Sequence, residues 1–435
     1  MKIKVIQKTY QEVKELPPVK HQKPLKQLTL LRLILKPVCY VLLKIDGFVG
    51  YKKIGMEKLG KKEPCLILMN HSCFMDMKMV AYMLGNRPYH IVATLDSFVG
   101  LKWILRLLGC IPTRKFINDL HLIKDMRYAI KELKESVLMY PEAGYSFDGC
   151  ATAIPESLGK CVKLLQAPVV MIRTKGAFLR NPLYNELRLR KVPVSATMEY
   201  ILSPEEIKAK SVDEINAILE DQFTFDAFKE QQEEGLVIAD ETRAEGLQRL
   251  LYQCPHCMIE GKTKGIGTQI RCGACGATYE LTETGALQLV EGADGTEADQ
   301  AQAKFTHIPD WYNWEREQVR KALEQDTYHL ELPVDIYISR DSKGLYQVGE
   351  GMLTHSKEGF HLTGCEGALD YKHSPSTAHS LNADFYWYEI GDMICVGDDK
   401  LQYCCFPKGT ENIVTKTRLA TEELYKMLKR PAKQA

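Results

Sequence analysis

A histidine and an aspartate, five residues apart, follow the apolar run LILM at residues 66–69. On a regular helix, with about 100° per residue, the side chains of His71 and Asp76 would point about 140° away from each other. They can therefore meet only near a turn between a strand and a helix. There, Asp76 accepts a hydrogen bond from one imidazole nitrogen, and the other nitrogen removes a proton from an attacking hydroxyl. The spacing thus predicts general-base chemistry at His71.

The same spacing is weak evidence when it stands alone, because about 0.6 such pairs are expected by chance in a chain with 11 histidines. Three later segments supply context: LGCIPTRK at 108–115, YPEAGYS at 140–146 and APVVMI at 167–172. Together with NHSCFMD at 70–76, these segments resemble the ordered blocks of the glycerolipid acyltransferase family. The resemblance covers residues 28–200.

This resemblance implies a direct acyl transfer from acyl-CoA or an acyl-carrier protein to the free hydroxyl of a lysophospholipid, with 1-acylglycerol 3-phosphate as the leading acceptor. It implies a catalytic role for His71 and Asp76 and gives no nucleophilic role to Ser72 or Cys73. The acceptor-binding positions that it implies are Asn70, Arg114, Lys115, Glu142 and Gly144. A guanidinium at Arg114 can hold a phosphate through two parallel hydrogen bonds, although a basic pair after a strand can also be merely solvated.

The third block departs from the family pattern. The family's Glu-Gly-Thr-Arg is Glu-Ala-Gly-Tyr at residues 142–145, so the arginine that helps to hold a glycerol phosphate is absent. Arg173 or Lys175, directly after the fourth block, can supply the missing charge. Alternatively, the acceptor carries a different head group, or the enzyme moves acyl groups between phospholipids.

Four cysteines form a second motif, with the spacing CxxC-x14-CxxC. Cys254, Cys257, Cys272 and Cys275 match the tetrahedral requirement of a structural Zn²⁺ site, with each pair closing a tight turn onto the ion. A complete set of four thiolates leaves no open position for catalysis, and His256 is interpreted as a turn residue. Zinc ribbons often bind nucleic acid, which keeps a non-catalytic adaptor as an alternative. The three basic residues of this segment are too few to favour it.

Composition limits the class of protein further. Lys and Arg total 57 against 56 for Asp and Glu, so the net charge of +1 gives no reason to bind a polyanion. Fourteen cysteines without a cleavable signal peptide indicate a reducing location. Residues 28–49 are strongly apolar, but Arg32, Lys36, Lys44 and Pro37 interrupt them. We expect two short helices lying in a membrane interface, with a hairpin packed on the protein's own core as the alternative. A peripheral or monotopic enzyme on a cytoplasmic membrane face follows.

Alternating apolar runs and helical segments favour an α/β fold with a mixed central sheet at residues 51–250, after an N-terminal extension and interface helices at 1–50. A zinc ribbon is expected at 251–285, and a linker and helix at 286–327. Residues 328–435 alternate in the manner of strands and end in an amphipathic helix. This pattern predicts a β-rich domain, which we interpret as a pleckstrin-homology-like barrel.

Overall fold

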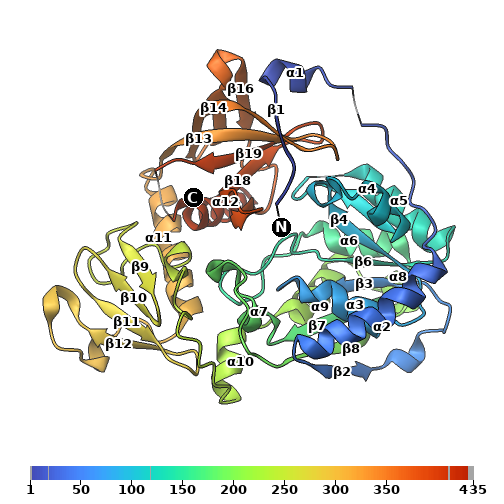
Figure 1. The fold of residues 1–435 in the computed structure, drawn as a ribbon, viewed down its shortest axis with the longest axis horizontal. Helices are drawn as coiled ribbons and strands as arrows, with labels where there is room; N and C mark the ends of the chain where they lie inside the picture. The colour runs from blue at the N-terminus through green and yellow to red at the C-terminus, as the bar shows by residue number, and fades with distance from the viewer. Residues whose placement is uncertain (1, 18, 118, 410–411, 430–435) are drawn as a thin grey trace.

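Three separate sheets organise the chain in the computed structural model, which describes residues 2–17, 19–117, 119–409 and 412–429 (Figure 1). A seven-stranded sheet lies at the lower right of the view, a four-stranded sheet at the lower left and an eight-stranded sheet at the top. No helix within the described residues is long and apolar enough to span a membrane.

The seven-stranded sheet is mixed, as the sequence predicts, and its order is β2-β8-β7-β3-β6-β4-β5. Its strands are β2 (Phe48–Ile54), β3 (Leu66–Met69), β4 (Tyr89–Thr94), β5 (Cys110–Thr113), β6 (Ser136–Met139), β7 (Val169–Lys175) and β8 (Val194–Leu202). β3 runs parallel to both β6 and β7, whereas β8 is antiparallel to β7. Along β3, Ile67 and Met69 pack on one face, and Leu66 and Leu68 pack on the other. All four residues are buried because both faces of the sheet are covered.

Helices α2, α3 and α4 pack on one face of this sheet, and α5, α6 and α9 pack on the other. Their bounds are α2 (Thr29–Ile45), α3 (Met75–Met83), α4 (Lys102–Leu107), α5 (Leu120–Lys131), α6 (Ser157–Leu165) and α9 (Val212–Phe223). The shorter helices are α1 (Tyr10–Lys14), α7 (Ala177–Arg180), α8 (Pro204–Ala209) and α10 (Ala227–Glu233).

The prediction of two short helices at residues 28–49 is wrong, because α2 is one helix that contains Pro37. Proline removes one backbone hydrogen bond and crowds the preceding turn. Pro37 lies on the exposed side of α2, so its ring leaves the packed side, with Cys39 and Leu43, undisturbed.

The four cysteines of the second motif belong to the four-stranded antiparallel sheet and the turns beside it. Its strands are β9 (Thr263–Ile266), β10 (Gln269–Cys272), β11 (Thr278–Leu281) and β12 (Leu287–Glu291), in the order β12-β11-β10-β9. β12 therefore extends this module past residue 285, the boundary that the sequence suggested.

The C-terminal part is β-rich and ends in a helix, as predicted. Its strands are β13 (Leu330–Ser339), β14 (Leu345–Ser356), β15 (Gly359–Gly364), β16 (Leu369–His373), β17 (Asn382–Trp387), β18 (Gly391–Gly397) and β19 (Gln402–Pro407). They pair in the order β16-β15-β14-β13-β19-β18-β17. Helix α11 (Ile308–Glu324) precedes this sheet and packs against the terminal helix α12 (Ile413–Lys429).

The N-terminal strand β1 (Val5–Gln7) belongs to the C-terminal sheet, an arrangement that the sequence did not predict. It pairs in parallel with residues 345–347 of β14, whereas β15 pairs only with residues 351–356. The beginning of β14 therefore has an open edge, and β1 satisfies its backbone groups. In Figure 1 the chain then descends along the seven-stranded domain to α2.

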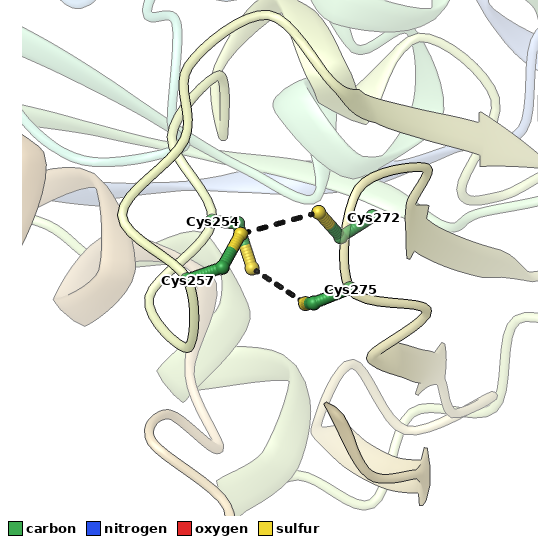
Figure 2. Close-up of side chains that lie close together, drawn as sticks. All are labelled: Cys254, Cys257, Cys272 and Cys275. Carbon is green, nitrogen blue, oxygen red and sulfur yellow. Dashed lines mark hydrogen bonds between the residues drawn. The ribbon is translucent and has the colours of Figure 1, made fainter. Parts of the chain in front are cut away.

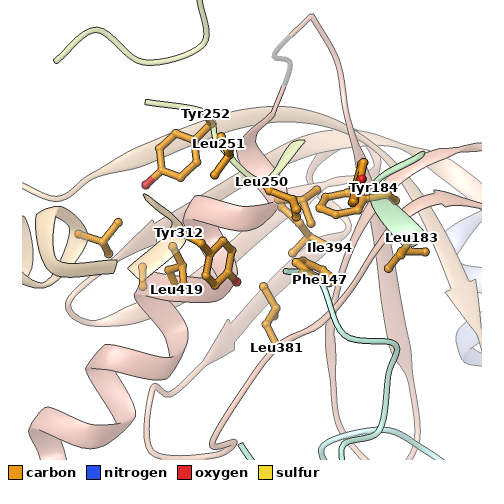
Figure 3. Packing of buried hydrophobic residues seen from close by; sticks show 14 of the residues in the cluster. Phe147, Leu183, Tyr184, Leu250, Leu251, Tyr252, Tyr312, Leu381, Ile394 and Leu419 are labelled. Atoms are coloured by element: carbon orange, nitrogen blue, oxygen red, sulfur yellow. The ribbon is translucent and has the colours of Figure 1, made fainter. Parts of the chain in front are cut away.

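One large hydrophobic core joins all three parts (Figure 3). Phe147 and Tyr184 come from the seven-stranded domain, Leu250 from the segment that leads into the cysteine module, and Ile394 and Leu419 from the C-terminal part. The three parts therefore pack together as one unit, because none of them buries these hydrophobic residues alone.

Gly246 tests this junction. Its φ is +84°, and a Cβ there would lie 2.0 Å from the Tyr184 carbonyl oxygen. Gly235 also has a positive φ, +61°, but nothing lies within 4 Å of its Cβ position. We expect Gly246→Ala to lower the free energy of unfolding by roughly 1–3 kcal/mol more than Gly235→Ala, because only the former adds overpacking to backbone strain. Urea denaturation measures the difference, and equal losses would contradict the tight junction.

Candidate functional site

The predicted site residues lie at one edge of the seven-stranded sheet. β3, β4, β5 and β6 are parallel, so their carboxyl ends meet at the same edge. His71 follows β3, Arg114 follows β5, and Tyr140 follows β6. The sheet therefore gathers segments that are separated by up to about 70 positions in the sequence.

His71 and Asp76 meet at the turn between β3 and α3, as their spacing predicts. The imidazole Nδ1 lies 2.9 Å from Asp76 Oδ2, and this oxygen also accepts hydrogen bonds from the backbone N–H groups of Ser72 and Cys73 at 2.9 and 3.2 Å. Asp76 is fully buried, whereas the His71 side chain is 22% exposed. Within the described chain, the imidazole Nε2 has no protein hydrogen-bond partner, and it is left for a ligand.

Two tyrosines hold the imidazole ring from its sides. The ring centroid of Tyr140 lies 4.1 Å from that of His71 in a stacked geometry, and the centroid of Tyr145 lies 4.3 Å away in a tilted one. These contacts restrict rotation of the imidazole and shield it from water. Tyr145 occupies the position where the family pattern has arginine, and it packs on His71 instead of offering a charge.

Glu142 binds the backbone of two loops, one at His71 and one at Thr152. Its Oε2 accepts a hydrogen bond from the backbone N–H of His71 at 2.9 Å, and its Oε1 accepts one from the N–H of Thr152 at 3.0 Å. The side chain is 1% exposed, and burial raises its pKa to about 7 against the two backbone donors. The predicted contact with the acceptor stays a prediction, since both oxygens already hold the protein's own backbone.

Asn70 ties β3 to β7. Its Oδ1 accepts a hydrogen bond from the Thr174 backbone N–H at 2.9 Å, and its amide nitrogen lies 3.1 Å from Thr174 Oγ1. The residue is buried. The structure thus shows a link between neighbouring strands, and an acceptor contact by Asn70 remains a prediction.

Arg114 and Lys115 lie where the seven-stranded domain meets the C-terminal sheet. Arg114 donates from Nη2 to the Arg340 carbonyl oxygen at 3.3 Å, and burial lowers its pKa. Lys115 lies close enough to Asp384 to oppose the raised pKa of that carboxyl, which burial brings to about 6. Both predicted acceptor residues therefore face the C-terminal domain, and their contact with an acceptor stays a prediction.

A strained backbone marks the loop of the third block. Ala143 has a φ of 56°, in the left-handed region that favours glycine, and it occupies the glycine position of the family pattern. Gly144 has open space around its Cβ position, which agrees with room for a ligand beside its backbone.

The C-terminal domain reaches the same edge through β17 and the turn after it. Tyr388 donates a hydrogen bond from Oη to Asp96 Oδ2 at 2.7 Å, and the ring of Phe385 lies 4.5 Å from that of Phe147. Sequence reasoning missed these residues, and no motif could have identified them. The aromatic residues of the third block were visible in the sequence, but their contact with His71 was not.

Arg173 and Lys175 have partners of their own. Arg173 forms an ion pair with Glu199 at 2.6 Å, and Lys175 forms one with Glu234 at 2.6 Å. Their charges are thus partly balanced before any acceptor arrives, which weakens the suggestion that they replace the missing arginine.

Comparison with known proteins identifies this region. Residues 51–175 match the model of the family described as Acyltransferase. Residues 51–175 are an acyltransferase domain. This match supports the enzyme class that the sequence predicts.

No curated protein matches the chain. Among solved structures, the chain is similar to the crystal structure of the 1-acyl-sn-glycerophosphate (LPA) acyltransferase PlsC from Thermotoga maritima. The identity is 17%, the match covers 45% of this chain and 80% of that chain, and the TM-score is 0.31.

The cysteine cluster lies outside the acyltransferase domain and has the geometry of a metal site (Figure 2). The four sulfurs lie within 4.8 Å of one another, and the Cys254–Cys275 and Cys257–Cys272 pairs are each separated by 3.7 Å. A tetrahedral zinc site with bonds of about 2.3 Å places its sulfurs about 3.8 Å apart. The residues therefore fit such an ion. His256 is not part of the cluster, and its Nε2 lies 2.8 Å from Tyr279 Oη.

The raised pKa of Glu142 predicts how stability depends on pH. An ordinary value of 4.5 becomes about 7 in the folded acyltransferase domain, so between these pH values the folded state binds more protons than the unfolded state. The contribution of Glu142 to the free energy of unfolding must then fall as pH rises through this window. We expect the wild type to lose stability relative to Glu142→Gln by up to roughly 3 kcal/mol across the window.

Urea denaturation at several pH values measures this difference, with Glu297→Gln at an exposed position as the control. Parallel curves for wild type and Glu142→Gln would show that the carboxyl of Glu142 is ionised normally.

Proposed function

We propose that the protein transfers a fatty acyl group from acyl-CoA or an acyl-carrier protein to the free hydroxyl of a lysophospholipid at a membrane surface. The observation that carries this proposal is the His71–Asp76 pair, with Nδ1 held by a buried carboxylate and Nε2 left for the acceptor. The acyltransferase family match supports the same class of reaction.

The chemistry follows from that geometry. Nε2 of His71 takes the proton of the acceptor hydroxyl while the hydroxyl oxygen attacks the thioester carbonyl. A C–O bond forms, the C–S bond breaks, and the thiolate leaves with the electron pair. Asp76 stabilises the imidazolium that is formed, and the rings of Tyr140 and Tyr145 keep the imidazole in its orientation. Cys73 has no nucleophilic role, because it is buried and burial raises the pKa of its thiol well above the ordinary value.

For the acceptor, 1-acylglycerol 3-phosphate is the leading candidate, with Arg114 and Lys115 contacting its phosphate. A second candidate is a lysolipid with another head group, or transfer between phospholipids. Tyr145 favours this second candidate, since it stands at the position of the missing arginine and packs against His71. A panel of acceptors with different head groups distinguishes the two.

The partner surface is a membrane, which the protein meets from the cytoplasmic side as a peripheral or monotopic enzyme. Helix α2 supports this part of the proposal, because it combines basic residues with large exposed apolar side chains.

The remaining modules have structural roles in this proposal. The cysteine cluster holds Zn²⁺ as a zinc ribbon, and Cys254, Cys257, Cys272 and Cys275 supply all four ligands. The ion, when bound, fixes the two turns in place. The C-terminal part has a pleckstrin-homology-like architecture, a proposal that the strand order and the terminal helix α12 support.

Metal content tests the ribbon. We expect about one zinc per chain in the purified protein and a loss of most of it in Cys272→Ser, with a fall in melting temperature, because a structural ion stabilises the folded state by its binding free energy. Cys365→Ser, outside the cluster, serves as the control. A metal-free wild type with the same melting temperature as Cys272→Ser would refute a structural metal.

Acyl transfer from labelled acyl-CoA and acyl-carrier protein to a panel of lysolipids tests the function itself. We expect His71→Ala to lower the rate at least about 10³-fold and Asp76→Asn about 10²- to 10⁴-fold, because the base is lost or loses its supporting charge. Cys73→Ser should remain active and serves as the matched control.

Equal rates for wild type and folded His71→Ala would remove His71 as the base. Loss of activity in Cys73→Ser with normal folding would instead point to a covalent acyl-enzyme.

A further inference from the structure

We propose that helix α4 and Phe74 form a second membrane-docking element, which together with α2 seats the enzyme on an anionic bilayer with the His71 site facing the lipid. This inference rests on the proposed function and names the surface through which the site obtains its acceptor. Its occupant is a lipid bilayer.

The first observation is an imbalance between the two faces of the seven-stranded domain. On one face, α2 exposes eight large apolar side chains and α4 exposes three. The helices on the other face, α5, α6 and α9, together expose two, Leu120 and Leu164. Scattered exposed apolar residues are ordinary on a soluble protein, whereas a contiguous patch marks an interaction surface.

The exposed residues of α2 follow helical spacing. Leu30, Ile34, Val38, Val41 and Ile45 recur every three or four residues, and each is at least 47% exposed. Cys39 and Leu43 occupy that packed side. A helix that is apolar on both its packed side and its open side has no stable solvent-facing surface, and it needs an apolar partner.

Helix α4 repeats this arrangement on a smaller scale. Trp103 is 72% exposed and Ile104 is 57% exposed, while Leu105 packs inward against the core. Lys102 and Arg106 flank them. A tryptophan beside basic residues is the typical composition of a helix in the headgroup region of a bilayer.

The two helices are joined at one end. Gln27, which precedes α2, donates from Nε2 to the Leu108 carbonyl oxygen at the end of α4, at 3.0 Å. Arg106 of α4 donates to Gln22 and to the Lys23 carbonyl oxygen. The segment that leads into α2, which contains Lys20, Lys23 and Lys26, is therefore tied to α4.

Charge selects the occupant. Residues 19–45 contain six Lys and Arg residues and no Asp or Glu, and α4 contains Lys102 and Arg106 and no Asp or Glu. Anionic lipid head groups attract such segments. A second copy of this chain would bring the same basic segments together, which costs free energy. The surface therefore fits a bilayer better than a dimer.

Phe74 connects this patch to the active site. It precedes α3 directly, three residues after His71, and its side chain is 66% exposed. Because α3 packs on the same face as α2 and α4, Phe74 is exposed at the end of that face where the chain carries His71. A lysolipid can then reach Nε2 of His71 without leaving the interface.

The test compares two double variants that add equal charge on opposite faces. Trp103→Glu/Ile104→Glu alters the proposed docking element, and Leu120→Glu/Leu164→Glu is the matched control. Flotation with vesicles of phosphatidylcholine and phosphatidylglycerol measures binding. We expect at least about a tenfold loss of binding in the first variant, because two charges enter the interface, and little change in the control.

Activity with two acceptors separates this inference from the proposed function. We expect the Trp103→Glu/Ile104→Glu variant to lose transfer to a long-chain lysolipid in vesicles and to keep transfer to a short-chain, water-soluble lysolipid. Quenching of Trp103 fluorescence by brominated lipid, absent in Trp103→Phe, gives an independent measure of insertion.

Unchanged vesicle binding in the docking variant would overturn the inference, while activity on the soluble acceptor would leave the proposed function standing. A wild type that binds vesicles through Trp103 but transfers no acyl group would overturn the proposed function and leave the docking surface standing. Dimers in lipid-free buffer that the docking variant breaks, with no vesicle binding by the wild type, would assign the surface to a second copy and overturn the bilayer.

Discussion

The buried carboxylate of Asp76 is the contact on which the catalytic site depends. One oxygen accepts the imidazole N–H of His71 and two backbone N–H groups, so a single charge fixes the ring, the turn and the start of α3. A carboxylate buried to this degree needs such donors, because desolvation without them costs several kcal/mol. Two other buried side chains accept backbone hydrogen bonds in the same way. Glu142 accepts one from His71 in the same turn, and Asn70 accepts one from Thr174, which fixes the end of β3 against β7.

The C-terminal domain is built into the transferase. It shares a hydrophobic core with the catalytic part, receives the N-terminal strand on the open edge of β14, and contacts the catalytic edge through Tyr388 and Arg340. Arg114 accordingly lies at the junction of two domains. Any change that loosens this junction also changes the surroundings of that arginine.

The altered third block also changes how the base is held. Tyr145 fills the place of an arginine and packs on His71, while Ala143, at the glycine position of the family pattern, adopts a left-handed backbone conformation. At position 145 the loop therefore places an aromatic ring beside His71 where the family pattern has a charged side chain.

The sequence alone indicated the enzyme class through the order of four motif blocks, the α/β domain through apolar runs of strand length, and the cysteine cluster through two CxxC turns. It could not determine that Pro37 lies within one helix, since whether a proline is tolerated depends on which side of the helix packs. It also could not place β1 on β14, or Tyr388 beside Asp96, because those contacts join residues hundreds of positions apart. Only the folded chain brings such surfaces together, and burial there, rather than any local preference, decides which polar groups find partners.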